Sequence, residues 1–135
     1  MSAMTPDGPV GFTCQSFSSH SLSPTLISFS VNTSSASWPL VRSAGCLGVS
    51  VLAEDQEDVA RTFATSGIDK FAGVSWTLGP GGSPLLEGAL AHFEGEIIDV
   101  STHGDHDIVI VGATHATAHP GRPLLYYRGT FSKFT

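Results

Sequence analysis

Residues 10–38 decide the fold, and their sequence is VGFTCQSFSSHSLSPTLISFSVNTSSASW. Residues 10–15 and 26–31 each alternate apolar with small or polar side chains, the period of a half-buried strand. We therefore expect two strands joined by a hydroxyl-rich turn in one hairpin. A second hydroxyl-rich loop, 32–37, then opens a helix at Trp38. Such a hairpin presents two rows of hydrogen-bond donors, which would suit an anionic ligand with polar edges.

The donors of this stretch favour a ligand that carries phosphate. A glycine inside a strand often marks close approach by a ligand or by another backbone, so Gly11 beside Thr13 predicts a flat group along that face. Pro39 suits the first turn of a helix and Ser37 suits its cap, and free N–H groups at a helix start attract phosphate. Serine-rich segments are also ordinary turn formers, so a plain loop is the alternative interpretation.

Composition limits the classes of protein and partner. The 135 residues predict one domain, 1–135, and carry six basic and twelve acidic side chains. A protein that binds nucleic acid needs a row of Lys and Arg side chains along the phosphate backbone. This acidic chain lacks such a row, so we expect no nucleic-acid partner. Neither a charged leader nor an apolar run of about 18 residues is present, so no membrane contact is expected. Cys14 and Cys46 are interpreted as buried free thiols of a cytoplasmic protein.

The rest of the chain predicts a mainly β domain with two packed helices. Helices are expected at 38–44, ended by Gly45, and at 54–64. Strands are expected at 46–52, 74–78, 89–100, 106–117 and 124–131. Because strands are many and closely spaced, without alternation with helices, we predict an antiparallel barrel with the helices packed outside.

The sequence does not support several other kinds of site. The histidines around His103–His106 and at 115 and 119 invite a metal hypothesis, but they fall at different ends of predicted strands, so we expect no metal site. No nucleophile elbow, paired-cysteine motif or phosphate-binding loop is present. The glycine-rich loop 79–84 lacks the spacing of a dinucleotide fingerprint.

An ordered set of motifs resembles the short-chain flavin reductases, the reductase partners of two-component monooxygenases. These motifs are GFTCQSF, SLSPT, NTSSASWP, VLAEDQE, DKFAG, PLLEGALA, GDH and PLLYYRG. The resemblance implies an antiparallel FMN-binding split barrel, usually a homodimer with flavin near the subunit interface. It also implies that this chain lacks the family's N-terminal helix and part of its first strand.

The same resemblance implies site residues. Flavin (FMN or FAD) contacts carry over to Gly11, Phe12, Thr13, Gln15, Ser16, Ser30, Val31, Asn32, Thr33, Ser34, Ser35, Ala36, Asp69 and Lys70. Nicotinamide (NADH or NADPH) contacts carry over to His106, Tyr126, Tyr127, Arg128 and Gly129, with His106 as the catalytic residue that positions the hydride donor. Lys70 is expected to lie near the flavin phosphate, although an exposed lysine needs no such role.

The predicted function is reduction of free flavin by NADH or NADPH. The reduced flavin would serve a separate monooxygenase, plausibly one that hydroxylates an aromatic or steroid-derived phenol. In this chemistry the cofactors react while the protein holds them in place, which fits a chain rich in hydroxyls and poor in acid–base clusters. The alternative is a binding-only split barrel for flavin, deazaflavin or haem, without nicotinamide turnover.

Overall fold

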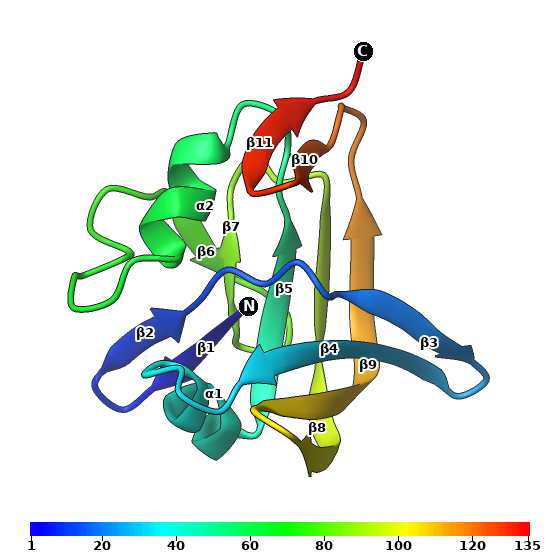
Figure 1. Ribbon diagram of the computed structural model, residues 1–135. Coiled ribbons are helices and arrows are strands. Elements are labelled where there is room, and N and C mark those ends of the chain that lie inside the picture. The colour runs from blue at the N-terminus through cyan, green and yellow to red at the C-terminus, as the bar shows by residue number, and fades with distance from the viewer.

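The computed structural model describes all residues from 1 to 135 and contains two helices and eleven strands (Figure 1). The helices are α1 (Trp38–Ala44) and α2 (Glu57–Phe63). The strands are β1 (Ser2–Thr5), β2 (Gly8–Gly11), β3 (Ser18–Leu22), β4 (Thr25–Asn32), β5 (Cys46–Val51), β6 (Trp76–Leu78), β7 (Pro84–Leu86), β8 (Ala91–His103), β9 (His106–Ala118), β10 (Leu124–Tyr127) and β11 (Thr130–Lys133).

A curved antiparallel sheet of seven strands is the body of the molecule. Its order is β2-β1-β5-β8-β9-β4-β3, and two small hairpins, β6-β7 and β10-β11, complete the strands. The chain from β2 to β3 runs across the open side of the sheet, from one edge strand to the other (Figure 1). On the way Phe12 N donates to Met1 O (2.9 Å), and Ser30 N donates to Ser16 Oγ (2.8 Å). This segment therefore links the two edges of the split barrel.

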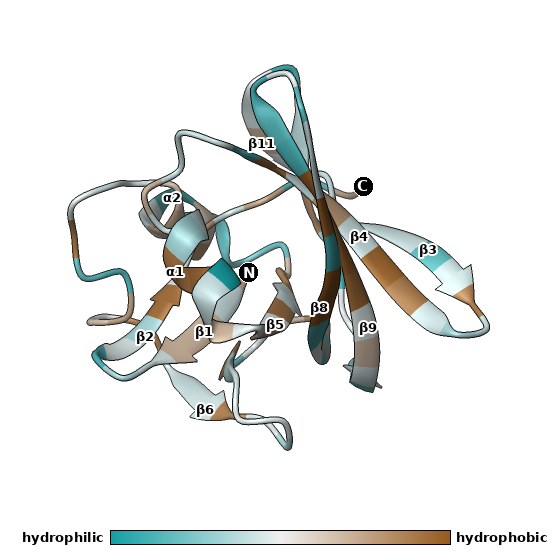
Figure 2. Ribbon diagram, turned by 90° about the horizontal axis from the view of Figure 1, so that it is seen from below, coloured by the Kyte–Doolittle hydropathy of each residue, from teal (hydrophilic) through white to brown (hydrophobic).

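An aromatic cluster fills the inside of the curved sheet. The rings of Phe12, Phe29 and Trp38 lie 5.9–6.5 Å apart and meet at steep angles, a favourable arrangement for aromatic pairs. Strand β4 alternates apolar and polar residues, as its brown and pale bands show (Figure 2). Its inward-facing residues reach the same core as Val109 and Val111 of β9. Neither helix is long and apolar enough to cross a membrane.

The predicted fold class and several elements are confirmed. The helix at 38–44 has the predicted bounds, and Gly45 ends it with a φ of 77°, a conformation that glycine adopts without strain. The strands expected at 26–31, 46–52 and 106–117 correspond to β4, β5 and β9 within one residue at each end. Ser37 does stand at the cap position, but its side chain makes no capping bond. Instead, Trp38 N donates to Ser35 Oγ at 3.3 Å.

The predicted pairing of the first hairpin is wrong. Strand β2 pairs with β1, whereas β4 pairs with β3, whose residues we had expected to form a hydroxyl-rich turn. β3 is an edge strand exposed to water, so its serines and histidine give no apolar alternation by which to recognise it. The close neighbours of Gly11 are also part of the protein: a side-chain carbon there would lie 2.7 Å from Met1 O and 3.1 Å from the Phe63 ring.

Three further expectations need correction. The single strand expected at 124–131 is a hairpin, because Arg128 and Gly129 both adopt positive φ and reverse the chain. Helix α2 begins at Glu57 rather than 54, since the preceding residues form a turn in which Ala53 N donates to the Gln56 side chain. Both cysteines are free, but neither is buried as expected: Cys14 is half-buried and Cys46 is exposed.

Candidate functional site

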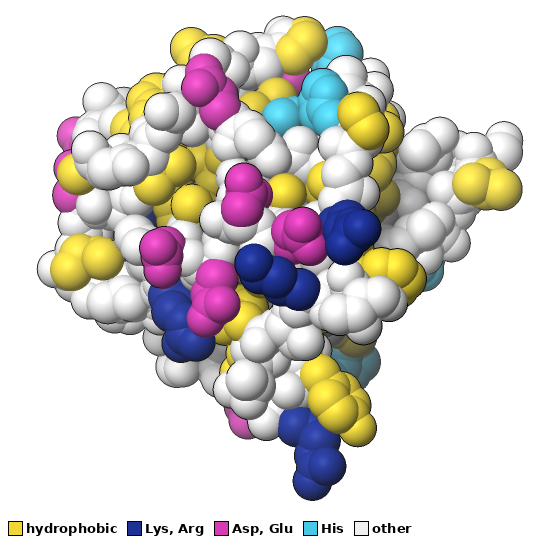
Figure 3. All heavy atoms as spheres, turned by 90° about the horizontal axis from the view of Figure 1, so that it is seen from above, with side chains coloured by type: hydrophobic (Ala, Val, Ile, Leu, Met, Phe, Trp, Pro, Cys, Tyr) yellow, Lys and Arg dark blue, Asp and Glu magenta, His cyan; other side chains and the backbone are white.

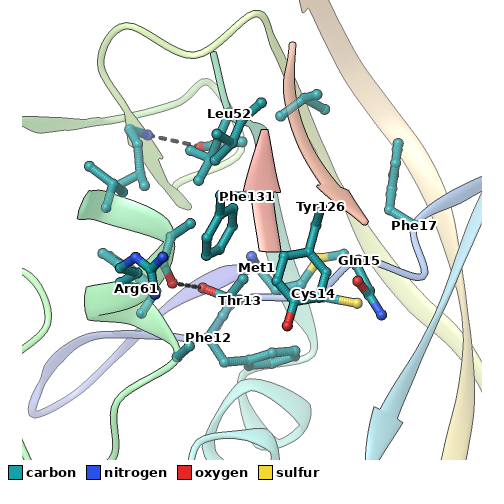
Figure 4. Close-up of a pocket in the computed structure, with 18 of the residues that line it drawn as sticks. Met1, Phe12, Thr13, Cys14, Gln15, Phe17, Leu52, Arg61, Tyr126 and Phe131 are labelled. Atoms are coloured by element: carbon teal, nitrogen blue, oxygen red, sulfur yellow. Dashed lines mark hydrogen bonds between the residues drawn. The ribbon is translucent and has the colours of Figure 1, made fainter. Parts of the chain in front are cut away.

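A cavity of about 800 Å³ opens between α2, the β10–β11 hairpin and the segment that follows β2 (Figure 4). Tyr126 from the hairpin and Gln15 from the segment after β2 both line it, and Phe131 points from the hairpin towards α2 (Figure 4). Five of the predicted site residues line this cavity: Phe12, Thr13, Gln15, Tyr126 and Gly129. Its size lies within the range of small-molecule sites.

Helix α2 holds both walls of the cavity. Thr13 Oγ1 donates to Ala60 O at 2.6 Å, which fixes the segment after β2 against the helix. The Arg61 guanidinium lies 4.9 Å from the centre of the Phe131 ring, close enough for a cation–π contact, and it also pairs with Glu57 at 2.7 Å. The C-terminal hairpin, β10–β11, is thus joined to α2 through one exposed arginine.

The tip of the C-terminal hairpin is exposed. Tyr127 is 72% exposed and Tyr126 48% exposed, and the turn at Arg128 and Gly129 follows directly. Residues 122–135 hold three of the chain's six Lys and Arg and no Asp or Glu. On the face seen from above, nevertheless, acidic and basic side chains are mixed, with apolar side chains between them (Figure 3).

The loop 32–37, between β4 and α1, folds onto itself at the other end of the molecule. Asn32 Oδ1 accepts bonds from Ser34 N (2.9 Å) and Ser34 Oγ (2.8 Å), a turn that the asparagine side chain closes. Thr33 donates twice to Asp105 O, from N at 2.9 Å and from Oγ1 at 3.1 Å. The N–H groups of Ala36 and Ser37 donate to no protein acceptor, so they remain free for an anion.

Lys70 lies beneath this loop and uses its ammonium group inside the protein. Its Nζ donates to Gly11 O (2.9 Å), to Phe63 O (3.0 Å) and to Ser37 Oγ (3.2 Å). Partial burial lowers the pKa of Lys70, whereas the three oxygen acceptors favour the charged form. Lys70 therefore joins the end of β2, the end of α2 and the start of α1.

His106 begins β9 at the tip of the long β8–β9 hairpin. It is the β-ladder partner of Asn32, which places it beside the loop 32–37. Its Nδ1 lies 2.7 Å from Asp105 Oδ1, and this hydrogen bond and the imidazole's charge lower the pKa of Asp105. We call the loop 32–37 together with Lys70, Asp105 and His106 the cradle.

A buried carboxylate anchors the cradle to the core. Asp107, 5% exposed, accepts bonds from Thr102 Oγ1 (2.6 Å) and from Trp38 Nε1 (2.8 Å). These two donors, Thr102 first, lower the pKa of Asp107. The bonds join α1 to both strands of the β8–β9 hairpin, and the sequence interpretation did not identify them.

The remaining predicted residues lie in different surroundings. Val31 is 5% exposed and Phe12 7% exposed, so their side chains belong to the core. Ser16 and Ser30 bond to each other, with Ser16 Oγ also donating to Ser30 O at 2.9 Å. Asp69 accepts a bond from Phe71 N at 3.2 Å within its own loop.

A second buried carboxylate was missed by the sequence interpretation. Glu94, 2% exposed, accepts the N–H groups of Gly81 and Ser83, both at 2.9 Å. A side chain at Gly79 would collide with this carboxylate. The glycine-rich loop is therefore shaped around Glu94, and the sequence does not distinguish this residue from Glu96 and Asp99 of the same strand. The six histidines form no metal-binding group with other ligand side chains.

Most of the predicted site residues thus form two groups, which Lys70 of the cradle connects through its bonds to Gly11 O and Phe63 O beside the cavity. Thr13, Gln15, Tyr126 and Gly129 surround the cavity, while His106 belongs to the cradle. The C-terminal hairpin and the tip of the β8–β9 hairpin lie at opposite ends of the molecule (Figure 1). Each predicted ligand, flavin and nicotinamide, has expected contacts in both groups.

Comparison with known proteins identifies the family. The flavin reductase like domain matches residues 1–135. The chain belongs to this family. It is 41% identical over 125 residues to the flavin-dependent monooxygenase reductase subunit HsaB of Rhodococcus jostii, covering 92% of this chain and 64% of that protein. It is 38% identical over 136 residues to a flavin reductase of Pseudomonas putida, covering 99% of this chain and 80% of that protein.

Solved structures of relatives share the fold. The NADH:FAD oxidoreductase SgcE6 of Streptomyces globisporus, in complex with NAD and FAD fragments, superposes with a TM-score of 0.92 at 36% identity, covering 99% of this chain and 82% of that one. The nitrilotriacetate monooxygenase component B from Mycobacterium thermoresistibile gives a TM-score of 0.95 at 36% identity, covering 99% of this chain and 76% of that one. These matches confirm the split-barrel family inferred from the motifs.

Proposed function

We propose that this protein reduces flavin with NADH or NADPH and supplies the reduced flavin to a separate monooxygenase. The observation that carries the proposal is the match of the whole chain to a structure named as an NADH:FAD oxidoreductase in complex with NAD and FAD fragments. Relatives are also named FMN reductase (NADH) and NADH:FMN oxidoreductase. The cofactors are thus a flavin and a nicotinamide nucleotide.

The residues present fit these cofactors. The cavity offers aromatic and polar walls for a planar ring system, and Ala36 and Ser37 offer free N–H groups for a phosphate. The nicotinamide supplies a hydride and the flavin accepts it. The protein's own part is to hold both, to exclude water and to set their approach. In this proposal Thr13, Gln15 and the loop 32–37 hold flavin, while His106 and residues 126–129 hold nicotinamide.

Steady-state oxidation of NADH and of NADPH, each with and without added FMN or FAD, tests the activity. We expect oxidation that depends on flavin with at least one nicotinamide. Flavin binding without nicotinamide oxidation would instead support the binding-only alternative, which the names of the relatives do not favour. Neither binding nor turnover would contradict both.

The proposal includes a homodimer in which two chains complete each site. The support is that the cradle and the C-terminal hairpin lie at opposite ends of one chain. The outer face of β8 and β9 also exposes Ile98 (56%) and Ile108 (39%), an apolar surface typical of contact sites. A second copy covering this face would bury these isoleucines.

Sedimentation at several concentrations tests the dimer. Ile108→Asp should shift the protein towards monomer, whereas Leu22→Asp, at a position that is 88% exposed on the β3–β4 hairpin, should not. If each site takes His106 from one chain and Tyr127 from its partner, subunit exchange between the His106→Ala and Tyr127→Ala variants gives mixed dimers with one unaltered site. Their kcat/KM for NADH should therefore exceed the average of the two variants before exchange. A wild-type monomer at all concentrations would contradict the dimer.

We also propose a partner oxygenase and a cellular location for this protein. Relatives are named as reductase subunits of flavin-dependent monooxygenases, one of them for trigonelline, which supports an oxygenase partner for this chain. An aromatic or steroid-derived phenol is the substrate class we propose for that oxygenase. We also propose a cytoplasmic location, in keeping with the free thiols of Cys14 and Cys46.

A further inference from the structure

The hydrogen bond between Asp105 and His106 decides which nitrogen of the imidazole carries the proton. Nδ1 of His106 lies 2.7 Å from Asp105 Oδ1. Asp105 is ionised at neutral pH, because its pKa lies below the ordinary value. An ionised carboxylate only accepts hydrogen bonds, so Nδ1 must be the donor. In the neutral ring Nε2 is then an acceptor, and it makes no bond within the protein.

The backbone of Asp105 is itself held by the cradle. Its carbonyl oxygen accepts two bonds from Thr33, whose neighbour Asn32 is the ladder partner of His106. The turn before it is closed by Gly104 at a φ of 62°. Although the Asp105 side chain is 85% exposed, the backbone that carries it is therefore held in place. Asp105 thus joins the loop expected to hold flavin to the histidine expected to meet nicotinamide, in addition to the direct ladder pairing of Asn32 with His106.

We propose that Asp105 is a positioning residue that fixes His106 as the Nδ1–H tautomer and so presents Nε2 as a hydrogen-bond acceptor. The group that such an acceptor recognises is an N–H donor, and the carboxamide NH₂ of a nicotinamide is of that class. The inference rests on the proposed function for the identity of the ligand. The tautomer and its dependence on Asp105 do not rest on it.

Imidazole nitrogen NMR of the ligand-free protein tests the tautomer directly. The His106 signals are assigned by their loss in His106→Ala. We expect wild-type His106 to carry its proton on Nδ1 and Asp105→Ala to shift the proton to Nε2. His103, which pairs with His106 across the hairpin and makes no side-chain hydrogen bond, is an internal reference that should not change.

The second readout is discrimination between NADH and its reduced 3-acetylpyridine analogue, which lacks the amide N–H. The quantity compared is the ratio of kcat/KM for NADH to kcat/KM for the analogue. If Nε2 is an acceptor, this ratio should be about fivefold higher in wild type than in Asp105→Ala, which corresponds to one hydrogen bond. Comparing the ratio between variants cancels the analogue's own reactivity. Asp7→Ala, which removes an exposed carboxylate from the distant β1–β2 turn, should keep both the tautomer and the ratio of wild type.

An Nε2–H tautomer in wild type, or an unchanged tautomer in Asp105→Ala, would overturn the proposal. An unchanged discrimination ratio in Asp105→Ala would overturn the acceptor role. If wild type does not oxidise NADH with any flavin, the proposed function fails instead. The NMR result still decides the positioning claim in that case.

Discussion

The cradle and the C-terminal hairpin are held in place to very different degrees. In the cradle, Lys70, Thr33 and Asn32 use their polar atoms in bonds within the protein, and Asp107 ties the neighbouring strand to Trp38. The C-terminal hairpin exposes Tyr127 and is joined to α2 through the contact of Arg61 with Phe131. The polar groups of the cradle are thus already bonded within the protein, whereas the C-terminal hairpin is held at its base by the bond from Leu124 N to Leu52 O (3.1 Å) and exposes its tip.

This difference suggests a division of labour. A site whose groups are already ordered loses less entropy on binding, which suits the part proposed for the cradle in setting the approach of flavin and nicotinamide. The exposed tip of the hairpin can move at lower cost than a buried segment, which suits ligands that enter and leave in every cycle. The following predictions test this contrast, beginning with the largest effect.

Loss of the Lys70 clamp should have the largest effect on stability. Lys70→Met removes three hydrogen bonds from a charged donor, and the acceptors Gly11 O, Phe63 O and Ser37 Oγ lose their partner. We expect the free energy of unfolding to fall by about 2 kcal/mol, after allowance for partial exposure. Urea unfolding followed by tryptophan fluorescence measures it.

The matched control for this variant is Lys133→Met on the C-terminal hairpin. Lys133 is exposed and bonds to no other side chain, so its replacement should change the unfolding free energy by less than about 0.5 kcal/mol. Equal losses from the two lysine variants would remove the contrast between the two ends.

The next effect concerns catalysis at the cradle. His106→Ala should leave flavin affinity within a few-fold and lower kcat/KM for NADH by roughly 10-fold, about 1.4 kcal/mol, because the approach of the hydride donor is no longer set. Rapid-mixing reduction of bound flavin gives the rate. Wild-type rates at every NADH concentration would leave His106 with no part in the reaction.

A smaller kinetic effect is expected at the hairpin. Tyr127→Ala removes a side chain that is 72% exposed, so stability should stay within about 0.5 kcal/mol of wild type. The KM for NADH should nevertheless rise by about threefold, the loss of one exposed stacking contact. A large fall in stability would show that the hairpin is as firmly held as the cradle.

The smallest effect is a pH dependence at Asp107. The bonds from Thr102 and Trp38 lower its pKa in the folded protein, so its contribution to stability is present above the ordinary value of 3.8 and is lost as pH falls through the folded value. The unfolding free energy of wild type should therefore fall more steeply in acid than that of Asp107→Asn. Parallel slopes in urea titrations across this range would argue against the network.

The sequence was sufficient for the fold class and the family, and less so for pairing. Periodicity found β4 because apolar and polar residues alternate along it, and it found β5 from Leu47, Val49 and Val51, although Gly48 between them is buried too. It missed β3, whose residues lie at an exposed sheet edge, and it merged β10 with β11 because a turn of only Arg128 and Gly129 separates them. An apolar pattern indicates which residues of a strand are buried. Neither the exposed edge strand β3 nor the turn at Arg128 and Gly129 is buried, so no such pattern marks them.

The motifs proposed the members of the candidate site but gave no indication of their arrangement. Motifs placed Asn32 and His106 in the site, and ladder pairing brings them side by side. Nothing in the spacing of the residues indicates that the Lys70 ammonium donates hydrogen bonds to backbone oxygens. Nor does it indicate that Glu94 and Asp107 are buried carboxylates. Such bonds join elements that are distant in sequence, so only the folded chain shows them.

Anaerobic rapid mixing tests the central claim most directly. The protein with bound FMN or FAD is mixed with NADH or NADPH, and the loss of the flavin's visible absorbance is followed against protein-free flavin. We predict reduction in the presence of the protein at rates far above the protein-free control, with His106→Ala slower. Bound flavin that stays oxidised with both nicotinamides would contradict the assignment of this protein as a flavin reductase.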